Sequence, residues 1–121
     1  MANQSNNTSS NRGYVYVLSN PSFPAKFLKI GQSHSVTQRR KSLSNTSVPY
    51  PFVIELILEV DNYIAVEKVI HSMLSLQRVV QKKEFFAVSM KQALIEFKKV
   101  AKANNGILYK MVKGKKTQII P

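Results

Sequence analysis

The sequence predicts a small α/β domain of the α+β type, in which a three-stranded antiparallel sheet is flanked by helices. Two observations lead to this prediction, and the cysteine count limits the chemistry. Runs of aromatic and β-branched residues alternate with segments of helical periodicity. The 121 residues, 44% of them hydrophobic, suffice for one compact core. The chain has no cysteine, which excludes disulfides, cysteine-bound metals and thiol nucleophiles.

The strands are predicted by three apolar runs. Residues 14–18 and 27–31 are rich in aromatic and β-branched side chains. Pro21 and Pro24 lie between them and lack the N–H that a regular ladder requires, so a long loop should join these two strands as a hairpin. Residues 52–60 form the third run, which is long enough for a central strand.

The first helix is expected over residues 36–44. Ser35 and Gln38 have the spacing of a capping box, which places the start of the helix between them. Only two residues of this span are apolar, so the buried face of the helix should be thin. Arg39 lies three residues after the first of them and four before the second, and therefore on their side of the helix.

A second helix should begin at an N-cap formed by Asp61 or Asn62. Glu67 and His71 are four residues apart, so their side chains project from one line along this helix, beside its apolar face. The residues expected to be buried on that face are Ile64, Val66, Val69, Ile70, Met73 and Leu74.

The last third of the chain should add a strand and a helix. Residues 84–88 follow a basic turn and predict a short strand, in which Glu84 is expected to pair with a basic neighbour. Ser89 and Gln92 repeat the capping-box spacing at the start of a third helix. This helix should bury its apolar residues and expose the lysines at positions 91, 98, 99 and 102.

Three segments describe the expected domain organisation. Residues 1–12 are rich in Asn and Ser and should form a disordered tail. Residues 13–105 should form the single folded domain. Residues 106–121 are a basic C-terminal extension, which could fold as a hairpin or remain an extended arm.

The charge of the chain predicts a polyanionic partner. Eighteen Lys and Arg residues against six Asp and Glu residues give a formal net charge of +12. Such a field attracts phosphate backbones, and the resulting affinity should fall steeply with salt, although charge alone does not distinguish DNA from RNA. No signal peptide or membrane-spanning run is found, so no membrane partner is expected, and a cytoplasmic location, either nucleoid-associated or phage-encoded, is predicted.

Four side chains predict a phosphodiester-cleaving site. Tyr16, Arg39, Glu67 and His71 supply a phenol, a cation, a carboxylate and an imidazole, and each falls at an end or on a face of a predicted element. These are the groups that a one-metal nuclease uses. Each also has a structural interpretation: a core tyrosine, a half-buried arginine, a carboxylate paired with Lys68 or a nearby arginine, and a satisfied histidine.

The motifs of the chain, in their order, resemble the GIY-YIG nuclease superfamily, in particular its phage-type branch, whose second motif reads Lys-Ile-Gly. The likeness extends over roughly residues 13–100. It includes the segments "GYVYVLSNPSFP", "LKIG", "RRKSLS", "VPYPF", "EKVIHSML" and "EFFAVS". No single piece is specific, but the ordered set is.

The resemblance implies a role for each motif residue. Tyr16 corresponds to the first-motif tyrosine near the attacking water, and Arg39 to the arginine that contacts the scissile phosphate. Glu67 corresponds to the ligand of a single Mg²⁺ or Mn²⁺ ion, a cation that needs few protein oxygens. Gly31 corresponds to the second-motif glycine, which permits close packing beside the site.

The general base stays open at this point. Lys29 stands where better-known members of the superfamily have a second tyrosine, so either Lys29 or Tyr16 could accept the proton. Both groups titrate near 10 when unperturbed, and therefore either would need a lowered pKa. His71 is the remaining candidate for the base or the acid.

The resemblance implies a metal-dependent DNA endonuclease. Arg40, Lys41, Lys82 and Lys83 are expected to contact the nucleic-acid backbone. No further recognition module is visible, so sequence specificity would be modest or would come from a homo-oligomer or another partner. The alternatives are a noncatalytic DNA- or RNA-binding module with the same fold and a basic nucleoprotein that would not need Glu67.

Overall fold

The computed structural model describes residues 12–23, 27–44, 50–79 and 84–119. The expected disordered tail over residues 1–12 lies outside this part of the chain, except for Arg12. The strands are β1 (Arg12–Ser19), β2 (Phe27–Ser33), β3 (Val53–Asp61), β4 (Phe85–Ala87), β5 (Ile107–Val112) and β6 (Lys115–Gln118). The helices are α2 (Val36–Leu43), α3 (Tyr63–Met73) and α4 (Met90–Ala103), and a 3₁₀ turn, η1 (Ser75–Gln77), follows α3.

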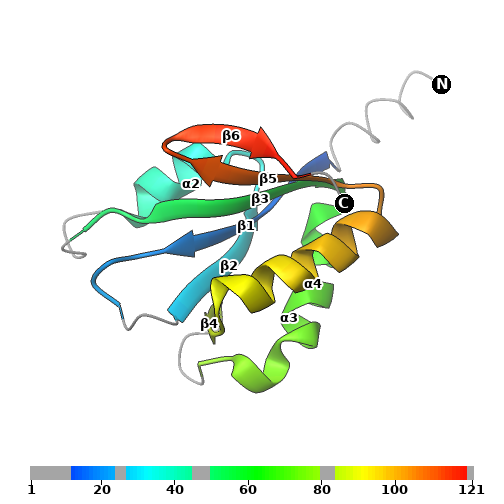
Figure 1. Cartoon of the computed structure of the whole chain (residues 1–121), viewed down its shortest axis with the longest axis horizontal. Coiled ribbons are helices and arrows are strands. Elements are labelled where there is room, and N and C mark those ends of the chain that lie inside the picture. Colours follow the sequence, from blue (N-terminus) through cyan, green and yellow to red (C-terminus); the bar gives the residue numbers. More distant parts are fainter. Residues whose placement is uncertain (1–11, 24–26, 45–49, 80–83, 120–121) are drawn as a thin grey trace.

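The fold is α+β, as predicted, but the expectation of three strands was wrong. The sheet has six strands in the order β4-β2-β1-β3-β5-β6, and all neighbouring pairs are antiparallel (Figure 1). The three expected strands form its centre. The pairings that join β4 to β2 and β5 to β3 connect segments far apart in sequence, such as Leu56 with Lys110, so local patterns gave no signal for them.

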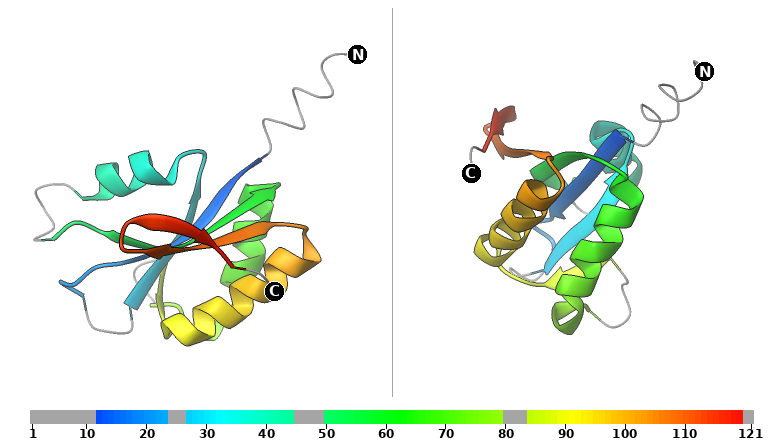
Figure 2. Two further views of the ribbon diagram at one scale, coloured as in Figure 1. Left: turned by 45° about the horizontal axis from the view of Figure 1, so that its top comes forward. Right: turned by 90° about the vertical axis from the view of Figure 1, so that its right-hand side faces the viewer.

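The C-terminal segment forms a hairpin, which answers the question that the sequence left open. Lys113 and Gly114 both have positive φ, at 50° and 78°, which gives the two-residue connection the twist that antiparallel strands prefer. β5 pairs with β3, so this segment continues the sheet. The hairpin lies far from β4, at the other side of the sheet (Figure 2, right).

The helices cover the two faces of the sheet unequally. α3 and α4 lie on one face and α2 on the other (Figure 1). Successive β1 residues point to opposite faces, so Val15 and Val17 enter the large core under α3 and α4, whereas Tyr16 enters the smaller core under α2. The buried residues of the smaller core are Tyr16, Leu18, Val36, Phe52 and Ile57.

Two predicted helix caps are confirmed. The Ser35 hydroxyl accepts a hydrogen bond from the backbone N–H of Gln38 at 3.3 Å, and α2 begins at Val36, directly after Ser35. Ser89 and Gln92 make the same contact at 3.1 Å at the start of α4. Asn62 occupies the N-cap position of α3 with φ of 54° but makes no side-chain cap hydrogen bond.

The buried face of α3 differs from the prediction. Ile64, Val69 and Met73 are 41–52% exposed, although all three were expected to be buried. The helix is rotated about its axis so that Glu67 is among its buried residues instead. Hydrophobicity alone could not predict this rotation, because it places a carboxylate in a buried position that an apolar side chain was expected to occupy.

No helix in the described residues is long and apolar enough to cross a bilayer.

Candidate active site

Gly31 allows the Tyr16 phenol to lie over β2. Tyr16 and Gly31 are direct partners in the β1–β2 pair, and Tyr16 is only 1% exposed. A Cβ atom at Gly31 would lie 2.7 Å from Tyr16 Cζ, closer than side chains tolerate, so the glycine is required by this close approach. Arg39 Nε on α2 donates a hydrogen bond to Tyr16 Oη at 3.4 Å. The phenol and the guanidinium therefore meet on the α2 face.

One edge of β2 is only partly paired with another strand, and residues of α3 and Glu84 contact the remainder. β4 pairs only with the first three residues of β2, and within the described part of the chain no strand continues the sheet beyond residues 30–33; we call this stretch the open edge. The Ile30 N–H donates to the Glu84 carbonyl at 2.9 Å. His71 Nε2 contacts the Ile30 carbonyl at 2.8 Å. Because a carbonyl only accepts, His71 Nε2 must carry the hydrogen.

Glu67 is a buried carboxylate at this edge. It is 8% exposed, and its Oε2 lies 3.7 Å from His71 Nε2. Burial raises the pKa of Glu67 to about 7, and the negative charge of Glu84 adds to this rise, while Lys29 and other nearby cations oppose it. A carboxylate in this state is half protonated near neutral pH, and a bound cation would stabilise its ionised form.

Lys29 and Glu84 form an ion pair beside Glu67. Lys29 Nζ lies 2.5 Å from Glu84 Oε1, and Lys29 is only 6% exposed. The ammonium also lies 5.2 Å from the centre of the Phe85 ring. The predicted pairing of Glu84 with a basic neighbour is thus confirmed. Its neighbour is a candidate site residue 55 positions away, which the sequence did not indicate.

The phenol and the imidazole of the site are both neutral near pH 7. Burial raises the pKa of Tyr16, although the hydrogen bond and charge of Arg39 lower it in part. Burial lowers the pKa of His71, and the hydrogen bond to Ile30 opposes this shift. The lowered pKa that a phenolate base at Tyr16 would require is therefore not found.

The remaining predicted nucleic-acid contacts are dispersed. Arg40 and Lys41 lie in the last turn of α2. Arg40 lines a groove of about 620 Å³ between α2, β3 and the tip of the β5–β6 hairpin, separate from the Tyr16 contact. Lys82 and Lys83 lie outside the described residues.

Sequence reasoning did not identify two charged groups that act on the site. The charge of Glu84 raises the pKa of both Tyr16 and Glu67, and the charge of Arg78 lowers that of Glu67 and His71. The only signal for Glu84 was its place in a predicted short strand, and the only signal for Arg78 was its place in the basic turn before that strand. Their influence depends on the pairing of β4 with β2, which brings them to the open edge.

A metal ion at this site would depend on one protein carboxylate. Among the described residues, no group of three or more His, Asp or Glu side chains could hold a metal ion. Glu67 alone suits Mg²⁺ or Mn²⁺, because such hard cations keep several waters and take further oxygens from a phosphate. Its raised pKa and its burial are consistent with a ligand that binds a cation.

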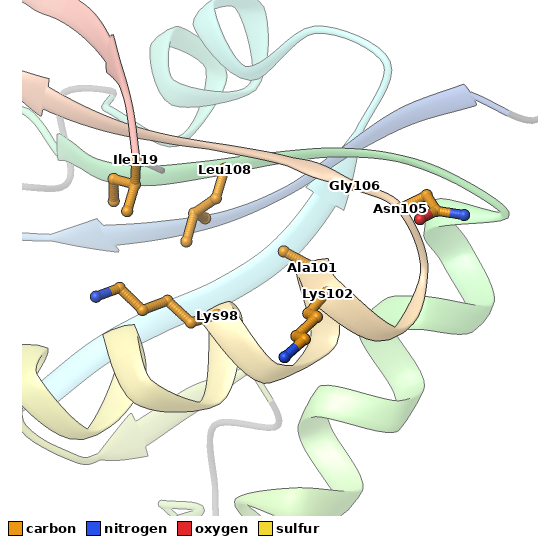
Figure 3. A pocket seen from close by; sticks show the side chains of 7 residues that line it. All are labelled: Lys98, Ala101, Lys102, Asn105, Gly106, Leu108 and Ile119. Atoms are coloured by element: carbon orange, nitrogen blue, oxygen red, sulfur yellow. The ribbon is translucent and has the colours of Figure 1, made fainter. Parts of the chain in front are cut away.

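Two cavities differ in their relation to the candidate site residues. One, of about 370 Å³, is lined by His71 on α3. The other, of about 240 Å³, lies between α4 and β5 and contains none of the candidate site residues (Figure 3). Its lining includes Lys98 and Lys102 on α4 and the apolar side chains of Leu108 and Ile119 across from them.

Comparison with known proteins identifies the family. No curated protein and no solved structure matches the chain. The T5orf172 domain matches residues 13–102, which contain all the candidate catalytic residues and end before the β5–β6 hairpin. This match covers most of the sequence, and the chain therefore belongs to the T5orf172 domain family.

Proposed function

We propose that this T5orf172 domain is a metal-dependent DNA endonuclease of the GIY-YIG type, which hydrolyses a phosphodiester bond at the open edge of β2. One observation carries the proposal. The phenol of Tyr16 on β1 accepts a hydrogen bond from Arg39 on α2, and the charge of the buried Glu67 on α3 acts on the same phenol. The net charge of +12 supports a nucleic-acid substrate.

Arg39 and Tyr16 orient the phosphate. Attack on a phosphodiester increases negative charge on the nonbridging and leaving oxygens, and a fixed guanidinium stabilises that charge. Arg39 is held by its bond to Tyr16 Oη. Because the phenol oxygen accepts this bond, its own proton remains available to donate to water or to a phosphate oxygen.

Glu67 holds the divalent ion, which when bound supplies a Lewis acid and makes water a stronger acid. The carboxylate must lose its proton to bind a cation. Since the pKa of Glu67 is about 7 in the chain alone, cation binding should strengthen as the pH rises through this value. Lys29, paired with Glu84, keeps a positive charge beside this carboxylate.

His71 is the best placed of the three candidate bases. The Tyr16 phenol keeps its proton near pH 7, and the Lys29 ammonium donates to Glu84. His71 is neutral and uses Nε2 as a donor, and within the described residues its Nδ1 makes no hydrogen bond, so the Nδ1 lone pair can accept a proton from the attacking water. Tyr16 then serves to position the water.

The test is cleavage of supercoiled plasmid DNA. The wild-type chain should nick the plasmid with Mg²⁺ or Mn²⁺ and not with EDTA. Glu67→Gln should bind DNA without cutting it. Glu96→Gln removes one acid from α4, away from the site, and should cut like the wild type. Cleavage by Glu67→Gln at the wild-type rate would refute the proposal.

A noncatalytic DNA- or RNA-binding module is the alternative, favoured by the basic charge of the chain alone. It predicts that the wild type binds nucleic acid but leaves it intact with every divalent ion tested. It also predicts that Glu67→Gln changes neither binding nor product formation.

A further inference from the structure

A polar pocket lies next to Glu67 on the outer side of α3. Its volume is about 370 Å³, and all five of its lining side chains carry nitrogen or hydroxyl groups that can hydrogen-bond. Two of them are cations, and none is an acid. We call it the α3–η1 pocket; its lining residues are Lys68, His71, Ser72, Ser75 and Arg78.

His71 connects this pocket to the candidate active site. It lines the pocket, and its Nε2 lies 3.7 Å from Glu67 Oε2. The positive charges of Lys68 and Arg78 both act on Glu67. A group bound in the pocket would therefore lie close to the carboxylate proposed to hold the cation.

Arg78 is held in place at the rim of the pocket. Its guanidinium carbon lies 5.3 Å from the centre of the fully buried Phe86 ring, and its backbone forms a bridge to the same residue. Neither Lys68 nor Arg78 takes part in an ion pair within the described residues. Two cations without carboxylate partners, beside two hydroxyls, have the chemistry of an oxyanion site.

We propose that the α3–η1 pocket binds a phosphate group of the DNA adjacent to the one attacked beside Glu67. The identity of the ligand rests on the proposed function, whereas the pocket and its charges do not. The phosphate could belong to a neighbouring phosphodiester of the strand or to a strand terminus, and both present oxyanions to the same donors. Its role is to fix the register of the strand at the site.

DNA binding in EDTA tests the pocket without any cleavage. Lys68→Gln/Arg78→Gln should weaken binding of a duplex oligonucleotide about tenfold and reduce the salt dependence of log K by about one unit of slope. The matched control is Lys98→Gln/Lys102→Gln, which removes the same charge from the cavity in Figure 3. If both double variants lose equal affinity, only net charge matters and the pocket is not a phosphate site.

A direct measurement uses the two histidines of the chain. Inorganic phosphate should shift the imidazole nitrogen resonances of His71 and leave those of His34 unchanged, because His34 packs against Tyr63 at the start of α3 and does not line the pocket. The shift should disappear in Lys68→Gln/Arg78→Gln. A His71 spectrum that does not respond to phosphate at any soluble concentration would overturn the proposal, as would equal shifts at both histidines.

A third arm identifies the source of the phosphate. Duplexes with and without 5′-terminal phosphates are compared with the wild type and Lys68→Gln/Arg78→Gln. A loss of affinity confined to phosphorylated ends assigns the pocket to a terminus, and an equal loss with both duplexes assigns it to an internal phosphodiester. All these measurements omit metal and therefore do not depend on cleavage. A wild type that cuts no DNA would refute the proposed function alone. Wild-type DNA affinity in Lys68→Gln/Arg78→Gln would refute only the phosphate site.

Discussion

The two edges of the sheet carry charge in opposite ways. At one edge every residue of β6 is exposed, including Lys115 and Lys116. At the other, Lys29 and Glu67 are less than a tenth exposed. Water screens the charges of the exposed edge, whereas burial raises the pKa of Glu67 and strengthens its interaction with neighbouring charges. Under the proposed function, the β6 edge attracts DNA and the β2 edge holds the reacting groups.

The cause of this difference is what covers each edge. β6 ends the sheet, and lysines on such a strand discourage pairing with another chain. β2 is covered by the polar side of α3, whose His71 bonds to the Ile30 carbonyl where a further strand would bond. Helix side chains can bring carboxylate and imidazole groups to this position, which a strand backbone cannot.

The largest expected effect separates Arg39 from its neighbour Arg40. Arg39→Ala should lower the cleavage rate about a hundredfold to a thousandfold, because it removes a fixed cation from the developing charge. Arg40→Ala should mainly weaken DNA binding, since Arg40 lies on the groove between α2 and the hairpin. Single-turnover cleavage at saturating protein checks both. Equal rate losses would show that α2 contributes only general charge.

The second expected effect is on stability as a function of pH. The pKa of Glu67 rises from 4.5 to about 7 on folding, so the contribution of this group to the free energy of unfolding should be largest below pH 4.5 and be lost as the pH rises through 7. The loss from this group should be on the order of 3 kcal/mol. Urea unfolding without divalent ions at a series of pH values measures it.

Glu67→Gln should abolish most of this pH dependence and stabilise the chain at pH 8, because it removes the buried charge. Glu96→Gln, whose carboxylate accepts a hydrogen bond from Gln92 on α4, should retain the wild-type dependence. If the Glu67 variant shows the wild-type curve, Glu67 is not the buried acid that distinguishes the β2 edge.

A smaller effect is expected from Gly31→Ala. The new Cβ would collide with the Tyr16 ring and should destabilise the fold by about 1–3 kcal/mol. Tyr16→Phe removes the atom that would collide most and should recover part of this loss. Urea unfolding of the single and double variants gives their coupling. Strictly additive effects would contradict the close approach of the phenol to β2.

The smallest effect is expected at the β6 edge. Lys115→Gln/Lys116→Gln should weaken DNA binding a few-fold with a shallower salt dependence, and should leave the cleavage rate of bound DNA unchanged. Binding titrations at several salt concentrations, followed by single-turnover cleavage, test this. A large drop in the cleavage rate would mean that this edge also takes part in the reaction.

Local signals predicted much of the fold. The serine caps of α2 and α4 and the central strands follow from residue spacing and type. The rotation of α3 did not, because Val69 and Met73 are as apolar as the residues that are buried. The site was predicted as an ordered set of residues, but the Lys29–Glu84 pair was not, because it joins residues 55 positions apart.

The sequence by itself determined which chemical groups are available: a phenol, two cations, a carboxylate and an imidazole, on elements that residue patterns define. Only the tertiary structure decided how they behave. A pKa depends on burial and on neighbouring charges, and both arise when α3 packs across the open edge of β2. Glu67 is an ordinary glutamate in the unfolded chain, and it becomes a candidate ligand because folding removes it from water.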